Sequence, residues 1–436
     1  MLLPADLPDI KLLSEGRVGS RPRLERLIDR FVELRHSAEN ERRRALWLAE
    51  ACARDQWHGT PLPGRFRDEG AIPFTVDLQY PIWQRLWPFY DLQEVFTSPS
   101  VFLDFQLARK IAQFQWLPDD TYLDDHIFIY LGAPFESTLF GMDVRYFSDA
   151  NPAVVHAPVI LSHENLLNRP LPDFYQDGLM PVAHRMWSEI GDILRGRINL
   201  QFVEWLRSPF GIATDIRGFD SLLVDMMIDP DFFHSLMDYV VRSQVAWYDE
   251  WSRFVGRQPE GISIFNDELD GSLMSANHYL ENIHQHEVEL NEAFGLVTYY
   301  HSCGNLTSMM PHIDRLPNIR MMDLGPYTEK AAALRSLRKQ YLFELRVQPE
   351  RDLLQASSTE MRAVLEEHVS VCRQFDVGAV TFRASGMQPV FADPLRVIGK
   401  IWEWVDIMRD IANGEAESGG HRGLLAGQVD ADETGA

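Results

Sequence analysis

The chain has 436 residues, of which 45% are hydrophobic and 11% aromatic, which is enough apolar material for a large buried core. Its formal net charge of −23 argues against a nucleic-acid or anionic-membrane partner, because both require a basic face. No apolar run approaches the length of a membrane span, and the N-terminus lacks the basic start of a signal peptide, so we expect a cytoplasmic protein. Three cysteines, Cys52, Cys303 and Cys372, are too few for a disulfide framework.

The two ends of the chain differ in composition from its middle. Residues 1–70 carry helical periodicity and many charges, notably between Arg21 and Arg54, and predict an N-terminal helical extension with a solvated face outside the core. Residues 414–436 are small and polar, so we predict that this tail is disordered. Residues 71–413 are expected to form the main folded domain.

From residue 70 onward, short apolar runs alternate with longer amphipathic stretches. We predict eight strands, at Ile72–Gln79, His126–Gly132, Ile198–Trp205, Ile262–Asp267, Leu296–His301, Ile319–Asp323, Tyr341–Leu345 and Ala379–Arg383. Helical patterns separate them, for instance Pro230–Phe254 and Ser358–Phe375. This alternation predicts an α/β fold with a parallel sheet, and the number of strands suggests a closed (β/α)8 TIM barrel.

The segment Phe294–Met310 says more about function than the rest of the chain. Its strand ends in His301 and Cys303, which share one face because side chains alternate along a strand. A Gly-Asn pair then breaks the strand, and Leu306–Leu316 has helical spacing, so we expect a helix N-terminus that favours the Cys303 thiolate. Imidazole and thiolate are ligands that zinc prefers. Spacing alone leaves a buried thiol beside a hydrogen-bonded histidine equally open.

Three histidines, one cysteine and an aromatic segment are interpreted as structural rather than functional. His278, His284 and His286 lie in a polar helical stretch and are interpreted as surface residues rather than ligands. Cys372 belongs to a helical stripe that faces the core, and the aromatic segment Tyr80–Phe89 is also interpreted as core. The sequence contains no dinucleotide-binding or phosphate-binding glycine motif, no Gly-x-Ser-x-Gly and no His-Glu-x-x-His.

The sequence Tyr300-His-Ser-Cys-Gly-Asn305 resembles the His-x-Cys-Gly segment of the uroporphyrinogen decarboxylase superfamily, in its methylcobalamin:coenzyme M methyltransferase branch. Further similarity follows in family order over residues 70–410, at Ser208–Gly211, Gly218–Asp225, Asp229–Asp231, Ile264–Glu268, Ser275, Pro349–Leu354, Gly378–Gly386 and Pro394. The resemblance implies the same barrel fold for residues 71–413. It also implies that His301 and Cys303 are zinc ligands, as their counterparts are in the methyltransferase branch.

In a parallel barrel the active site forms at the carboxyl ends of the strands. Chemically active side chains follow five consecutive predicted strands: Asp267, Glu268 and Asp270, then His301 and Cys303, then Asp323, then Glu344 and Arg346, then Arg383 and Ser385. We assign catalytic roles to Asp267, Asp323 and Arg383. Substrate-binding roles are assigned to Glu268, Arg346 and Ser385.

The third zinc ligand departs from the family pattern. The methyltransferases supply a cysteine from the loop after the last strand, where this chain reads Ala384-Ser-Gly-Met-Gln388. A carboxylate would have to replace it, as a glutamate does in the distantly related cobalamin-independent methionine synthases. We rank Asp323 first, Glu344 second and Glu268 third, and expect the ligand carboxylate within roughly 5 Å of His301 and Cys303.

These observations support three hypotheses. The leading one is a zinc-dependent methyltransferase that uses a methyl-corrinoid donor, free or on a corrinoid protein, and a small thiol-type acceptor. Uroporphyrinogen itself is disfavoured as a substrate, because Phe74–Tyr80 lacks the arginines that the decarboxylase branch has on its first strand. The alternative is a metal-independent carboxy-lyase, in which Arg346, Arg383 and Arg207 would hold a substrate carboxylate and Asp267 or Asp323 would relay the proton. The third is a non-catalytic barrel that binds a corrinoid protein or a small ligand.

Overall fold

The computed structural model of the protein describes residues 7–47, 53–55, 60–62, 72–155, 157–339 and 341–413. The disorder predicted for residues 414–436 therefore lies outside the described residues. The helices are α1 (Ile10–Ser14), α2 (Arg21–Arg35), α3 (Ala38–Arg44), α4 (Tyr80–Leu86), α5 (Leu92–Thr97), α6 (Pro99–Trp116), α7 (Phe135–Thr138), α8 (His163–Leu167), α9 (Met180–Leu194), α10 (Pro209–Arg217), α11 (Phe219–Ile228), α12 (Pro230–Val255), α13 (Ala276–His278), η2 (Tyr279–Ile283), α14 (His284–Phe294), α15 (Met310–Ile313), α16 (Lys330–Ser336), η3 (Pro349–Leu354), α17 (Ser358–Gln374) and α18 (Pro394–Asn413). The strands are β1 (Ala53–Asp55), β2 (Thr60–Leu62), β3 (Phe74–Leu78), β4 (His126–Phe128), β5 (Val144–Arg145), β6 (Ala153–Val154), β7 (Asn199–Gln201), β8 (Ile262–Phe265), β9 (Val297–His301), β10 (Ile319–Leu324), β11 (Leu342–Arg346) and β12 (Ala379–Met387).

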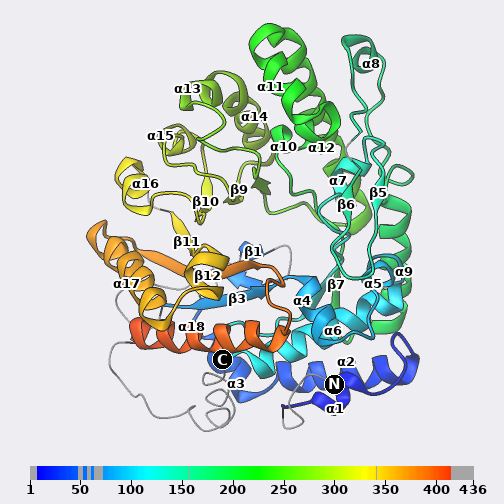
Figure 1. The fold of residues 1–436 in the computed structure, drawn as a ribbon. Coiled ribbons are helices and arrows are strands. Elements are labelled where there is room, and N and C mark those ends of the chain that lie inside the picture. The colour runs from blue at the N-terminus through cyan, green and yellow to red at the C-terminus, as the bar shows by residue number, and fades with distance from the viewer. Residues whose placement is uncertain are drawn as a thin grey trace.

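The main sheet contains six parallel strands in the order β3–β12–β11–β10–β9–β8. Two further parallel strands, β4 and β7, pair with each other, and a bridge between Arg207 and Phe265 joins the chain after β7 to β8. All eight predicted strands are therefore present, each within or overlapping its predicted range. The main sheet curls, and helices cover its outer side (Figure 1), so the prediction of an α/β fold of the TIM-barrel type with helices before the sheet is confirmed.

Individual hydrogen bonds rather than a strand ladder connect β3 to the segment before β4, among them a backbone bond from Asp120 N–H to the carbonyl oxygen of Phe74 (3.0 Å). The Asp119 carboxylate accepts a hydrogen bond from the backbone N–H of Val76 (2.9 Å), and the Asp120 carboxylate accepts one from that of Phe74 (3.3 Å). These bonds satisfy backbone donors of a strand that would otherwise be a sheet edge.

The alternation of side chains divides the strands between two apolar clusters. Outward-facing side chains such as Val76, Ile264 and Met322 join the large core beneath the surrounding helices. Inward-facing side chains form a smaller cluster, whose buried members are Trp47, Leu206, Phe265, Tyr299 and Met321. The acidic side chains of the inward face, Asp77, Asp323 and Glu344, lie toward the carboxyl ends of the strands, which is where a barrel carries its chemistry.

The N-terminal helices present the solvated face that their charge pattern predicts, but they do not lie outside the core. α2 packs on α6, and its residues Leu24, Leu27 and Phe31 are buried. Arg23 is also buried and its guanidinium pairs with Asp104 of α6 at 2.9 Å, with a further hydrogen bond to Tyr90 (3.1 Å). A count of charges could not reveal this, because a buried arginine is tolerated once a carboxylate and polar atoms satisfy it.

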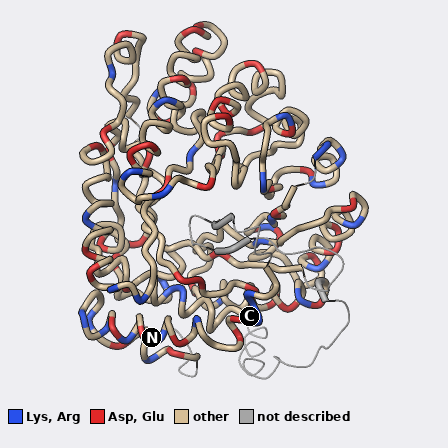
Figure 2. Tube along the Cα trace, turned by 180° about the vertical axis from the view of Figure 1, so that it is seen from behind, with Lys and Arg blue, Asp and Glu red and all other residues tan. Residues whose placement is uncertain are grey.

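The other structural interpretations have mixed outcomes. Most of the Tyr80–Phe89 segment is buried, as expected, although Phe89 is exposed. Acidic and basic residues are scattered over the helices rather than gathered on one basic face (Figure 2). Among the described residues, the helices are all too short or too polar to cross a lipid bilayer.

Candidate functional site

The register of the sheet sets the height of each polar side chain. His301, the last residue of β9, pairs with Phe265 on β8. On the other side of β9, Tyr300 pairs with Met322 of β10, so the next residue of β10, Asp323, lies at the level of His301. Asp323 in turn pairs with Glu344 of β11. Asp267 and Cys303 each lie two residues beyond this level. Because alternate residues share a face, Asp267 and Cys303 form the next layer toward the open end.

His301 connects the two layers. Its ring is 3% exposed, and its Nδ1 forms a short hydrogen bond with a carboxylate oxygen of Asp323. Its Nε2 lies 3.1 Å from Oδ1 of Asp267 and 3.5 Å from Sγ of Cys303. The backbone N–H of Cys303 donates to the same Asp267 oxygen at 3.0 Å. Nitrogen, oxygen and sulfur atoms from three side chains therefore converge on one point.

The charges around His301 favour its interaction with carboxylates. Burial and the Arg346 charge lower the pKa of His301, but Asp267 and Cys303 outweigh them and leave it well above its ordinary value. Burial raises the pKa of Asp267, yet the charge of His301 and hydrogen bonds from His301 and Cys303 hold it below its usual range. Asp267 is consequently a carboxylate at neutral pH, and 45% of its side chain remains exposed.

A buried ionic network lies beneath this cluster. Arg346 contacts Asp323 (3.2 Å) and Glu344 (2.9 Å) through its Nε, and the Tyr299 hydroxyl donates to Glu344 at 2.6 Å. Arg383 continues the network, with guanidinium nitrogens 3.5 Å from Glu344 and 3.2 Å from Asp77 on β3. Burial raises the pKa of Glu344 and lowers the pKa of Arg383 to about 9. Alternating charges hold these side chains in fixed positions around His301.

This arrangement corrects the order in which we ranked the carboxylates as candidates for the third zinc ligand. Asp267, which we had assigned to catalysis alone, is the carboxylate beside both His301 Nε2 and Cys303, with ligand atoms of all three residues within 4.8 Å of one another. Asp323 contacts the other ring nitrogen, and Glu344 lies one strand further away, bonded to Tyr299 and Arg346. The reason is the register, because a carboxylate at the height of Cys303 must come from the end of β8.

Two further expectations are corrected. The helix predicted over Leu306–Leu316 is shorter, since α15 spans Met310–Ile313 and is preceded by a turn in which the N–H groups of Met309 and Met310 donate to the carbonyl oxygen of Leu306. Glu268 is not part of the cluster of Asp267, His301 and Cys303, and it pairs with Arg207, which also contacts Asp215 at 3.0 Å. Ser385 is buried on β12, two residues beyond Arg383, and Cys372 is buried in α17 as predicted.

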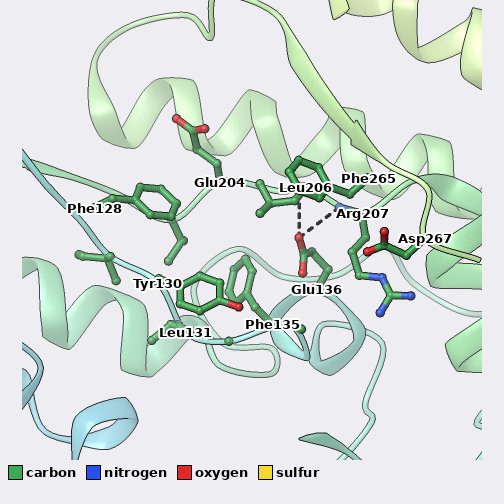
Figure 3. A pocket seen from close by; sticks show the side chains of 14 residues that line it. Phe128, Tyr130, Leu131, Phe135, Glu136, Glu204, Leu206, Arg207, Phe265 and Asp267 are labelled. Atoms are coloured by element: carbon green, nitrogen blue, oxygen red, sulfur yellow. Dashed lines mark hydrogen bonds between the residues drawn. The ribbon is translucent and has the colours of Figure 1, made fainter. Parts of the chain in front are cut away.

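A narrow, largely apolar pocket of about 50 Å³ opens beside the cluster (Figure 3). Its walls come from the chain after β4, the chain after β7 and the end of β8, and Phe128, Tyr130 and Phe135 form much of its lining. Arg207 and Asp267 stand together at one end of the labelled set. Inside, the Glu136 carboxylate accepts hydrogen bonds from the backbone N–H groups of Leu206 (2.7 Å) and Arg207 (3.3 Å).

Sequence reasoning missed Tyr299, Asp77 and Glu136. The first could have been found, because Tyr299 precedes His301 by two residues on the same face of a predicted strand. Asp77 could also have been found, because it is a charged residue at an inward position of the first predicted strand. Glu136 gave no signal, since it lies on the four-residue helix α7 and burial raises its pKa to about 6 only in the folded chain.

Comparison with solved structures shows a similar architecture. A methyltransferase from Methanosarcina mazei superposes with a TM-score of 0.58 over 79% of this chain and 95% of that one, at 12% sequence identity. At this identity the likeness concerns the fold. No curated protein sequence matches the chain.

The sequence profile of the uroporphyrinogen decarboxylase (URO-D) family matches residues 89–374, which include β4 and the strands from β7 to β11 together with the His301–Cys303 segment. This match spans well over half of the chain. The protein is therefore a member of the uroporphyrinogen decarboxylase family.

Proposed function

We propose that this family member is a zinc-dependent methyltransferase that moves a methyl group from a methyl-corrinoid to a thiol-type acceptor. The observation that carries the proposal is the convergence of Asp267 Oδ1, His301 Nε2 and Cys303 Sγ. Zinc bonds of about 2.0–2.3 Å at tetrahedral angles separate ligand atoms by roughly 3.3–3.7 Å. The distance of 3.5 Å from His301 Nε2 to Cys303 Sγ lies within this range, and the distance of 3.1 Å to Asp267 Oδ1 lies just below it.

The surroundings of His301 also fit a metal ligand. Asp323 can accept from Nδ1–H, so that once a metal displaces the Nε2 proton the Nε2 lone pair would face Asp267 and Cys303. Metal-binding histidines usually have such a partner, which fixes both the tautomer and the ring orientation. Three protein ligands with an exposed side are typical of a catalytic zinc site. Bound zinc would hold a thiol acceptor as its thiolate at neutral pH.

The chain's own residues would orient the acceptor. Phe265 contacts the His301 ring at 4.7 Å between centroids and also lines the apolar pocket, so the pocket leads from the cluster into the barrel wall. The small volume and aromatic lining of this pocket favour an acceptor whose thiol is attached to a slender alkyl chain. Asp267 and Cys303 are both exposed, which leaves the other side open to the methyl donor, carried free or by a corrinoid protein.

The lyase alternative receives less support from the ion pairs. It requires arginines that can hold a substrate carboxylate, but Arg346 already contacts Asp323 and Glu344. Arg207 likewise contacts Asp215 and Glu268. Because a new carboxylate would have to displace these partners, the arginines are better suited to positioning than to substrate capture.

Metal analysis and a methyl-transfer assay test the proposal. We expect zinc in the purified protein, lost from this site in H301A and C303A and retained in C372A, which removes a buried thiol outside the cluster. With methylcobalamin and simple alkyl thiols, wild type and C372A should demethylate the corrinoid, visible as a change in its absorption spectrum. Normal activity of metal-free wild type would overturn the zinc assignment, and carbon dioxide release from an acidic substrate without methyl transfer would favour the lyase.

A further inference from the structure

A second set of metal-ligating side chains lies between α12 and α14, on elements that do not carry the strand-end cluster. Asp238 belongs to α12, and His286 and Glu289 lie one turn apart on α14. Their ligand atoms are all within 4.8 Å of one another. Nδ1 of His286 is 3.2 Å from a carboxylate oxygen of Asp238 and 3.7 Å from one of Glu289. Both carboxylates are about half exposed, with exposed fractions of 52% and 49%.

His286 corrects the sequence interpretation of this stretch. It was expected at the surface with His278 and His284, but it is 1% exposed. Its Nδ1 is fully buried and has no hydrogen-bond partner among the described residues, although it points between the two carboxylates. A buried polar atom that lacks a partner is rare and calls for a ligand, an ion or a water molecule.

The other ring nitrogen of His286 already has polar neighbours. Its Nε2 lies 3.1 Å from Nδ1 of His234 and 3.2 Å from the side-chain amide nitrogen of Gln285. In the tautomer with the proton on Nε2, the Nδ1 lone pair faces the two carboxylates, because a neutral imidazole has one N–H. That tautomer is the one that can bind a cation together with Asp238 and Glu289.

We propose that Asp238, His286 and Glu289 bind a divalent transition-metal cation, zinc in the first place, and that this ion links α12 to α14. A cation would give the buried Nδ1 a partner and would neutralise the two carboxylates beside it. The imidazole nitrogen favours zinc over calcium or magnesium, which prefer oxygen ligands. With the cation on Nδ1, the Nε2 N–H is 3.1 Å from His234 Nδ1 and can make the outer hydrogen bond that metal-binding histidines usually have.

Solvent reaches this site through a surface pocket. Asp238 and Glu289 line a cavity of about 460 Å³ together with His163, Leu166, Leu167, Ser235 and Arg242. Water can therefore complete the coordination, and the ion can enter without unfolding of either helix. The inference does not depend on methyl transfer at the strand ends.

Zinc titration of chelator-treated, full-length protein tests the proposal. The C303A variant disables the strand-end cluster, and in this background we expect about one zinc per chain and a rise of roughly 3 °C in melting temperature at zinc concentrations near 100 times Kd. D238N/E289Q in the same background should lose both the binding and the shift. E292Q, which removes a nearby exposed charge on α14 that is not part of the cluster, should retain them.

Cobalt separates the two sites by spectroscopy. In the wild-type background D238N/E289Q should keep the near-ultraviolet thiolate-to-cobalt band of Cys303, whereas C303A should bind cobalt without that band. Both variants are needed because buried His286 is a poor target for substitution, while Asp238 and Glu289 are exposed. Equal zinc binding by C303A and C303A/D238N/E289Q, or no binding by C303A, would overturn the second site. Equal numbers of zinc ions bound by C303A and by the wild-type protein would instead refute the proposed catalytic site.

Discussion

At the scale of single residues, the site depends on which nitrogen of His301 faces which carboxylate. Asp323 is fully buried and bonds Nδ1, whereas Asp267 approaches Nε2 from the exposed side. The two aspartates therefore differ in role although both contact the same ring. Asp323 is placed to orient the imidazole, and Asp267 belongs to the group of side chains that could hold a metal ion.

This division predicts the effect of D323N. The substitution removes the charge that fixes the His301 tautomer, so we expect zinc affinity to fall about 10- to 100-fold. Competition with a chromogenic chelator measures the affinity. E268Q is the control, because it removes a carboxylate charge that pairs with Arg207 outside the cluster. Equal affinities of D323N and wild type would show that Asp323 does not orient the ligand.

A second residue-scale prediction concerns Asp119, a carboxylate remote from the cluster. Burial, opposed by the Arg43 charge, raises the pKa of Asp119 from 3.8 to about 6. The folded state therefore holds this proton more tightly than the unfolded state, so the stabilisation is complete below pH 4 and is lost as pH rises through 6. D119N keeps an acceptor for Val76 N–H and should gain up to about 3 kcal/mol relative to wild type over this range.

Urea unfolding between pH 4 and 7 measures this difference. The exposed Glu94 provides the control E94Q, whose stability should follow that of wild type with pH. A constant difference between D119N and wild type would mean that Asp119 is ionised throughout.

At the scale of elements, the site relies on close contact between the turns after neighbouring strands. Gly325 follows β10, and a Cβ atom at this position would lie 2.3 Å from the carbonyl oxygen of Ser302, one residue before Cys303. The backbone after β10 can therefore approach the Cys303 turn only without a side chain. Gly304 is in the same position relative to β8, since a Cβ there would lie 2.2 Å from the carbonyl oxygen of Leu269.

We predict that G325A lowers zinc affinity and stability together. The added methyl must push the Cys303 turn away from its partners, and such overpacking costs typically about 1–3 kcal/mol. Equilibrium unfolding and zinc competition report the two effects. G378A is the matched control, because a Cβ at Gly378 meets no atom within 4 Å. If G325A binds zinc as wild type does, the two turns move independently.

At the scale of the whole molecule, the N-terminal helices belong to the same cooperative structure as the sheet. α2 packs on α6, and the buried pair between Arg23 and Asp104 joins them with support from Tyr90. Desolvated pairs of this kind contribute little net stability when intact, but removing one partner leaves the other buried and uncompensated. Separating the N-terminal helices from the rest of the fold would break this pair and is therefore energetically unfavourable.

R23M should accordingly destabilise the protein by about 3–5 kcal/mol, because Asp104 loses its partner. Denaturant unfolding followed by both circular dichroism and tryptophan fluorescence measures the loss and shows whether one transition remains. R26M, on the exposed side of α2, should change stability by less than about 0.5 kcal/mol. A separate early transition for the helices in wild type would contradict a single cooperative unit.

The sequence by itself determined the local features of this protein. Hydrophobic periodicity is a property of a few neighbouring residues, so it located all eight strands and showed that His301 and Cys303 share a face at a strand end. The same local signals did not show that one face of α2 joins the core or that His286 is buried, because burial depends on which helix packs opposite. Their charges and polarity are compatible with either environment until Asp104, Asp238 and Glu289 are brought close.

Only the tertiary structure decided which carboxylate joins His301 and Cys303. Asp267, Asp323 and Glu344 all follow strands, and their order around the barrel was visible in the chain. The chain did not show how far along the barrel axis each carboxylate lies, because the register between parallel strands is set by long-range hydrogen bonding and by the curl of the sheet. That register carries Asp267 to the level of Cys303 and holds Asp323 two residues lower, where it reaches the opposite nitrogen of the ring.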